Sequence, residues 1–199
     1  MSSPYSDLQL DALRELANIG SGTAATALSS MLGRPVDVSV PSARALPLAE
    51  AVEATGDPEA EANAVVIPVI GDLTGVVLLL FTPEDAAGIC RLLGVEPDSE
   101  WAESALGEIG NIVGTSYMNA MGAMTGLEME PDPPLAARDM LGALVASVVM
   151  DQLDGTSDTT LLLDSELLVE GESCSMSFLL VPAAGGVQVL LERLGLGDA

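Results

Sequence analysis

Two acid–amide pairs are the residues of this chain best suited to chemistry: Glu15 with Asn18, and Glu108 with Asn111. The members of each pair are three positions apart, so on a helix they lie about one turn apart on one face. A carboxylate can pair with a Lys or Arg of a partner, and an amide can orient a water molecule for attack because it both donates and accepts hydrogen bonds. Neither pair contains a nucleophile. We interpret them as groups that complete an active site on another protein; the alternative is a solvated helix surface.

The pairs belong to a longer pattern that occurs twice. The first copy consists of Asp11, Glu15, Asn18 and Pro41, and the second of Ser104, Glu108, Asn111 and Pro134. Every residue of the second copy follows its counterpart by 93 positions, and nine residue pairs are identical between 11–41 and 104–134 without a gap. This period is too long for a solenoid repeat. We predict one domain over residues 1–199, built from two pseudo-symmetric halves, residues 6–97 and 98–199.

Two long helices must carry the pairs. Residues 6–32 have a capping residue at Ser6 or Asp7, a stop at Gly33 with Pro35, and apolar residues at helical spacing from Leu13 to Met31. Asp11, Glu15 and Asn18 fall approximately opposite that apolar face, so we expect them to face solvent. Residues 100–125 repeat the design.

The other elements follow the same order in both halves. In the first we expect a strand at 35–41, a short helix at 46–54, an acidic loop at 57–63, a hairpin at 64–70 and 74–81, and a helix to residue 93. In the second we expect strands at 127–131, 159–169 and 173–181 and a helix at 186–194; residues 140–152 are ambiguous, and the repeat favours a helix. The fold class is α+β, with two long exposed helices packed on a mainly antiparallel β-sheet.

The charge balance limits the possible partners. The chain has 30 acidic and 6 basic residues, a net charge of −24, and neither Lys nor His. Nucleic acid and anionic membrane surfaces are excluded as partners because both require a basic patch. The acidic surface predicts adaptation to high salt, as in a halophilic archaeon, where self-repulsion is screened; the alternative is an ordinary acidic surface.

The remaining sequence features point to a cytoplasmic protein without a metal of its own. The apolar runs are far shorter than the roughly 20 residues of a membrane span, and we see no signal peptide. Cys90 and Cys174 have no metal-ligand spacing and are expected to be buried free thiols. The sequence has no phosphate-binding loop, calcium loop or Ser/His/Asp set.

The doubled pattern resembles the signature of the CheC/CheX/FliY family of chemotaxis phosphatases. In that signature an Asp or Ser, a Glu and an Asn are followed by 22 intervening residues and a Pro, and both copies here match it. Two sites and a length near 200 resemble the two-site CheC form. The resemblance implies hydrolysis of the aspartyl-phosphate on the response regulator CheY, and a fold with two long exposed helices over a sheet.

The resemblance also implies roles for the residues. Asn18 or Asn111 would position water in line with phosphorus, and Glu15 or Glu108 would pair with an active-site Lys of the regulator. Asp11, Ser104, Pro41 and Pro134 would support the site. The regulator would supply the Mg²⁺, so no cofactor of the chain's own is expected. The receptor deamidase CheD is a second implied partner, and we expect a monomer. The alternative function is a non-catalytic adaptor that binds phosphorylated CheY or CheD, as in the flagellar switch.

Overall fold

The computed structural model describes residues 5–152, 159–169 and 172–197. Its elements are, in chain order, α1 (Asp7–Leu32), β1 (Val36–Pro47), α2 (Leu48–Thr55), β2 (Glu61–Gly71), β3 (Gly75–Phe81), α3 (Pro83–Leu92), α4 (Ala102–Thr125), β4 (Met129–Pro131), β5 (Leu135–Met140), α5 (Leu141–Gln152), β6 (Thr159–Val169), β7 (Glu172–Pro182) and α6 (Gly186–Arg193). The α+β prediction, with both long helices and the hairpin of β2 and β3, is confirmed.

The strands form a single antiparallel sheet whose order interleaves the two parts of the chain. The order is β1-β6-β7-β3-β2-β4, and β5 also pairs with β2. β1 therefore pairs with a strand from late in the chain, and β4 and β5 pair with a strand from early in it. This order is symmetric about the β3–β7 boundary, which is the arrangement that a pseudo-two-fold repeat requires. The boundaries of the halves, 6–97 and 98–199, stay a prediction.

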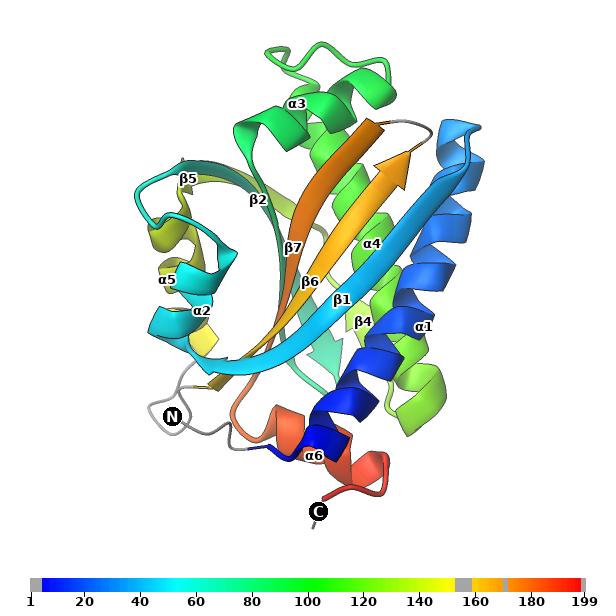
Figure 1. Ribbon diagram of the computed structural model, residues 1–199, viewed down its shortest axis with the longest axis vertical. Coiled ribbons are helices and arrows are strands. Elements are labelled where there is room, and N and C mark those ends of the chain that lie inside the picture. Colours follow the sequence, from blue (N-terminus) through cyan, green and yellow to red (C-terminus); the bar gives the residue numbers. More distant parts are fainter. Residues whose placement is uncertain (1–4, 153–158, 170–171, 198–199) are drawn as a thin grey trace.

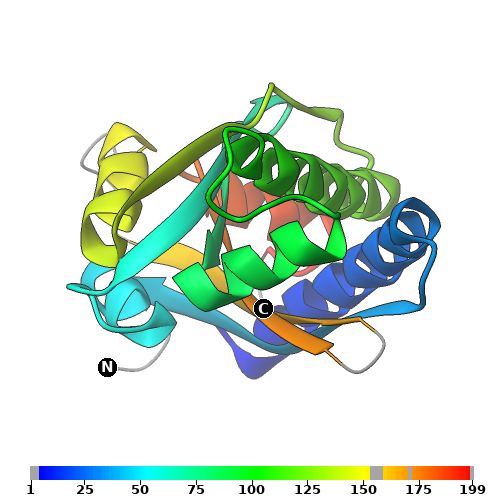
Figure 2. The ribbon, with the colours of Figure 1, turned by 90° about the horizontal axis from the view of Figure 1, so that it is seen from above.

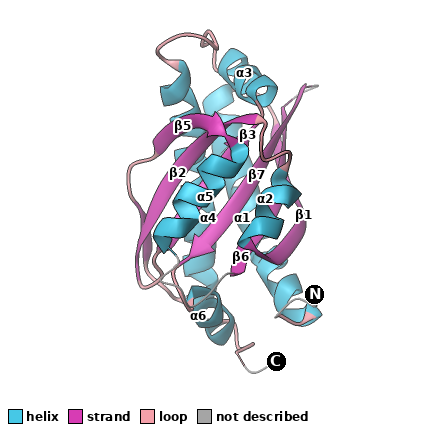
Figure 3. Cartoon of the chain, turned by 90° about the vertical axis from the view of Figure 1, so that its left-hand side faces the viewer, coloured by secondary structure: helices cyan, strands magenta, loops and turns pink. Residues whose placement is uncertain are grey.

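Helices cover both faces of the sheet (Figures 1 and 2). α1 and α4 lie side by side on one face, and α2 and α5 lie on the other, where Figure 3 shows them in front of the strands. Each face has its own apolar core. Val65, Leu79 and Phe178 belong to the core under α1 and α4, whereas Leu78 and Leu179 belong to the core under α2 and α5. Because α1 and α4 cover one face and α2 and α5 cover the other, β3 is buried along its whole length.

α1 is positioned by its caps and by one buried face. Ser6 and Gln9 form a reciprocal capping box, and Gly33 ends the helix in the left-handed conformation that glycine adopts without strain. Leu13 and Leu28 are buried against the sheet as expected. Met31, which we placed on the same face, is exposed instead, whereas its neighbour Leu32 is partly buried against the core.

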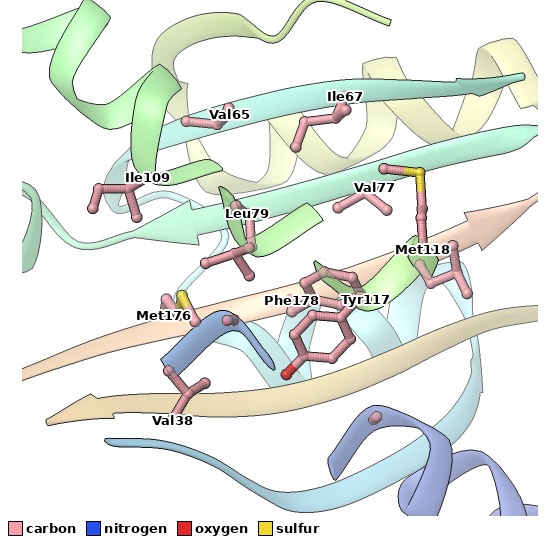
Figure 4. Close-up of a cluster of buried hydrophobic side chains, with 14 of the residues drawn as sticks. Val38, Val65, Ile67, Val77, Leu79, Ile109, Tyr117, Met118, Met176 and Phe178 are labelled. Atoms are coloured by element: carbon pink, nitrogen blue, oxygen red, sulfur yellow. The ribbon is translucent and has the colours of Figure 1, made fainter. Parts of the chain in front are cut away.

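α4 approaches the sheet and α1 closely because small residues line its buried side. A Cβ added to Gly110 would lie 2.5 Å from Val65 Cγ1, and one added to Gly20 of α1 would lie 2.9 Å from Tyr117 Cα. The Tyr117 ring stacks on Phe178 with 4.3 Å between centroids (Figure 4). α4 is therefore held in a fixed orientation between β2 and α1.

Three strand predictions were incomplete or wrong. β5 was not expected at all, and β1 continues well beyond residue 41. The acidic loop at 57–63 is too long by three residues, because β2 already begins at Glu61. Glu61 is opposite Met140 of β5 and forms an ion pair of 2.9 Å with Arg138, two residues along that strand, which favours strand pairing over a free loop. Residues 140–152 were ambiguous, with the repeat favouring a helix; residues 141–152 form the helix α5, and Met140 ends β5.

Two further expectations can be compared with the structure. Cys90 and Cys174 are buried free thiols, as predicted. None of the helices in the described part of the chain is both long and apolar enough to cross a membrane.

Candidate functional site

The first site lies on the outer face of α1. Asp11, Glu15 and Asn18 are all exposed, as their helical spacing predicts. The Asp11 carboxylate accepts an ion pair of 2.8 Å from the guanidinium of Arg14, one turn further along the helix. Both side chains are about half exposed, so this pair contributes little to stability. It does hold Asp11 toward Arg14, and it leaves Glu15 and Asn18 presented to solvent.

The second site lies on α4, where the structure brings all four predicted residues together. Ser104 and Glu108 are exposed and Asn111 is half-buried. These three, with Pro134 across from them, line one groove of about 350 Å³. Pro134 approaches the helix closely, because a Cβ added to Gly107 would lie 3.9 Å from its Cγ. The Glu and Asn thus stand on one wall of a hollow that a partner side chain can enter.

The motif prolines occupy equivalent places in the sheet. The pairing of β1 with β6 shifts register between Ser39 and Ser42, so the backbone of Pro41 lies in a bulge. In the other half, Pro134 lies in the break between β4 and β5. Proline has no N–H to donate to a strand ladder, which explains an interruption at each position. The side chain of Pro41 lies outside the described residues, so only the second site can be described with its proline.

Residue 14 of the first site and its counterpart 107 of the second make the two sites different in shape. Arg14 projects a charged side chain at the position where Gly107 leaves the groove open. Sequence reasoning missed this difference because it compared identical pairs only. The 93-residue offset that pairs Arg14 with Gly107 was the signal that could have revealed it.

The electrostatics of the groove favour a cationic group. Glu103 and Glu108 are the charged residues that line it. A neighbouring hollow of about 310 Å³ shares Glu103 and Ala136 with the groove and reaches Arg138. Two carboxylates around one small opening attract a Lys or Arg of a partner more strongly than a single one. Within the described part of the chain, no three His, Cys, Asp or Glu side chains are grouped so that they could hold a metal ion.

Sheet order, helical layers and paired sites together define a class of protein: an α+β domain whose two long helices carry acid–amide pairs at the surface. The family model of the CheC-like family matches residues 8–43 and 102–136, the segments that contain the two copies of the pattern. The chain is 31% identical over 167 residues to the CheY-P phosphatase CheC of Bacillus subtilis, an alignment covering 80% of this chain and 79% of the relative. The chain belongs to the CheC-like family.

Two further proteins resemble parts or the whole of the chain. The flagellar motor switch phosphatase FliY of Bacillus subtilis is 33% identical over 116 residues, which cover 58% of this chain and 30% of FliY. The X-ray structure of Thermotoga maritima FliY superposes with a TM-score of 0.79 at 21% identity, over 98% of this chain and 100% of that one. The second likeness shows a shared fold.

Proposed function

We propose that this chain is a phosphatase that hydrolyses the aspartyl-phosphate of the chemotaxis response regulator CheY. The observation that carries the proposal is the groove on α4, where Ser104, Glu108, Asn111 and Pro134 meet. The relatives named CheY-P phosphatase and motor switch phosphatase support the same activity.

The chemistry needs few groups from this chain. A water oxygen forms a bond to phosphorus while the bond from phosphorus to the aspartate oxygen breaks, which yields inorganic phosphate and a free carboxylate. The regulator would supply the phospho-aspartate and the Mg²⁺. Asn111, or Asn18 at the first site, would hold the water in line with phosphorus, as water-positioning amides do in GTPases.

The other site residues would bind and support. Glu108, or Glu15, would pair with the regulator's active-site Lys, because a carboxylate beside an ammonium forms a strong charge-assisted hydrogen bond. A supporting role for Asp11 agrees with its ion pair to Arg14, which occupies its carboxylate. Ser104 lines the groove, and its counterpart at the first site is Asp11, which has no hydroxyl, so we assign Ser104 a supporting role too.

The experiment is phosphate release from phosphorylated CheY in molar KCl, with the double variant Asn18→Ala/Asn111→Ala. Loss of one oriented group typically lowers the rate by roughly 10²–10³. We expect kcat to fall by that factor while binding of the regulator is retained. Asn119→Ala is the matched control, because Asn119 is an exposed amide on α4 outside the pattern. Near-normal turnover by the double variant would refute the role of the amides.

The alternative function is an adaptor that binds phosphorylated CheY or CheD without hydrolysis. The middle domain of FliM from H. pylori has the same fold, with a TM-score of 0.69 at 17% identity over 95% of this chain and 99% of that one, and this likeness shows the fold alone. An adaptor has no need of both a Glu and an Asn at each site, so the intact pairs favour the phosphatase. If the wild-type chain binds the phosphorylated regulator and leaves its dephosphorylation rate unchanged, the adaptor is the better description. CheD stays a proposed second partner.

A further inference from the structure

Each motif helix begins with a large apolar side chain that the solvent reaches. Leu8 near the start of α1 is 60% exposed, and Trp101 at the start of α4 is 65% exposed. The two residues are 93 positions apart, so they are counterparts in the repeat. Because their types differ, a comparison of identical pairs does not detect them. A single exposed apolar side chain is common on a protein surface and needs no explanation. Here two large ones recur at equivalent positions of both motif helices, and this recurrence is what indicates a shared interaction surface.

Both side chains lie in line with the acid–amide pairs. The Trp101 carbonyl accepts the backbone N–H of Ala105 at 2.9 Å, which places Trp101 in the helical register of α4. Glu108 follows Trp101 by seven positions, and Glu15 follows Leu8 by the same offset. At 3.6 residues per turn and a rise of 1.5 Å per residue, each apolar residue lies within about 20° of its Glu around the helix and about 10 Å along it.

The exposed Leu135 does not belong to this surface. It lies between Pro134 and Ala136, which both line the groove, so alternation along the strand turns its side chain to the other face. Trp101 is therefore the exposed apolar side chain that lies beyond one end of the row Ser104, Glu108 and Asn111 on α4.

We propose that Trp101 and Leu8 are the apolar anchors by which the two sites dock the phosphorylated response regulator; this inference rests on the proposed function. A stable protein partner covers about 800 Å² on each side, which is a disc of roughly 16 Å radius. A regulator centred on Glu108 and Asn111 therefore covers a residue about 10 Å away on the same face. Buried Trp residues are among the most frequent contributors to binding energy in such interfaces.

Kinetics separate this role from catalysis. In an Asn18→Ala background, which silences the first site, we expect Trp101→Ser to raise KM for the phosphorylated regulator roughly tenfold or more, with kcat unchanged. Trp101→Phe should restore most of the affinity. The Ser variant should fold, because Trp101 makes no side-chain capping hydrogen bond and Ser is a favourable N-cap residue. Leu8→Ser is tested in the same way in an Asn111→Ala background, which silences the second site, and KM should again rise with kcat unchanged.

The matched control is Leu168→Ser. Leu168 is 43% exposed on β6, and its neighbours Leu167 and Val169 point into the core beneath α1 and α4. Its side chain is therefore on the opposite face of the sheet. Unchanged KM in this variant, together with a raised KM in Trp101→Ser, supports the proposal.

A direct binding readout does not depend on hydrolysis. Trp101 is the sole Trp of the chain, so 5-fluorotryptophan labelling gives one ¹⁹F resonance. We expect that resonance to shift and broaden when phosphorylated regulator is added, and not when this chain alone is concentrated.

If the wild type accelerates dephosphorylation but KM is unchanged in Trp101→Ser and the resonance does not move, the proposal is overturned and the phosphatase stands. A resonance that moves only with the concentration of this chain means self-association and also overturns it. If there is no hydrolysis at all, a shift with regulator still supports docking at Trp101 while the proposed phosphatase fails.

Discussion

Gly110 lies between Glu108 and Asn111 and sets how closely the second site approaches the sheet. A Cβ at this position would lie 2.5 Å from Val65 Cγ1 and 3.0 Å from Val65 Cβ. Replacing a helical Gly by Ala gains about 1 kcal/mol of helix propensity, whereas overpacking a core costs about 1–3 kcal/mol. We expect Gly110→Ala to be destabilising or at best neutral, and α4 to be pushed away from β2.

Gly22 of α1 is the matched control, because no described atom lies within 4 Å of an added Cβ there. The propensity gain is the same in both variants, so it cancels in their difference. Gly22→Ala should be more stable than Gly110→Ala by about 1–3 kcal/mol. Urea unfolding at fixed molar KCl measures both free energies of unfolding. Equal values would refute the close packing of α4 on β2.

A second variant isolates the contact itself. Val65→Ala removes Cγ1, the atom nearest to the added methyl group. In a double-mutant cycle we expect the two changes to couple favourably, by about 0.5–3 kcal/mol. Additive effects would place the cost of Gly110→Ala elsewhere than at Val65.

Three further predictions concern charge. Glu15→Lys combined with Glu108→Lys should weaken binding of phosphorylated CheY, measured by titration, because it sets like charges against the regulator's Lys. The guanidinium of Arg138, by its hydrogen bond and its charge, lowers the pKa of Glu61; NMR titration should show this, and Arg138→Ala should abolish it. The stabilisation from that pair is present above the ordinary pKa of Glu61 and is lost as pH falls through the lowered one. The thermal midpoint should rise as KCl increases from 0.01 M to 1 M, because the Debye length falls from about 30 Å to about 3 Å; a flat midpoint would refute the adaptation to high salt.

The long helices were predictable because their signals are local. Ser6 and Gly33 act within one turn of the helix that they delimit, and the apolar spacing between them repeats several times. β5 carries no such signal: it is an edge strand with mostly exposed residues, so its sequence shows no alternation. The layer formed by α2 and α5 could have been predicted from β3, because its unbroken apolar run indicates a strand that is buried on both faces.

The candidate site was predictable in its residues and not in its shape. The doubled pattern singled out Glu108 and Asn111, and the helical period placed them on one face. The groove, however, depends on Gly107, on the return of Pro134 to the helix, and on the charge of Glu103 beside it. Glu103 and Gly107 lie on the same helix as Glu108, and a comparison of identical pairs passed over them. The approach of Pro134 to α4 is a contact between elements distant in sequence, which spacing along one helix cannot supply.

The interleaved sheet gives a physical reason why both motifs lie where they do. Its central strands are covered by helices on both faces, and in the described residues the two edges of the sheet are β1 and, on the other side, β4 with β5. α1 lies against the first of these edges and α4 against the second. Proline is tolerated at an edge, where a missing N–H breaks few ladder hydrogen bonds, and both motif prolines lie there. Because α1 and α4 run in opposite directions (Figure 1), their N-terminal halves, which carry Glu15 and Glu108, lie toward opposite ends of the helix pair.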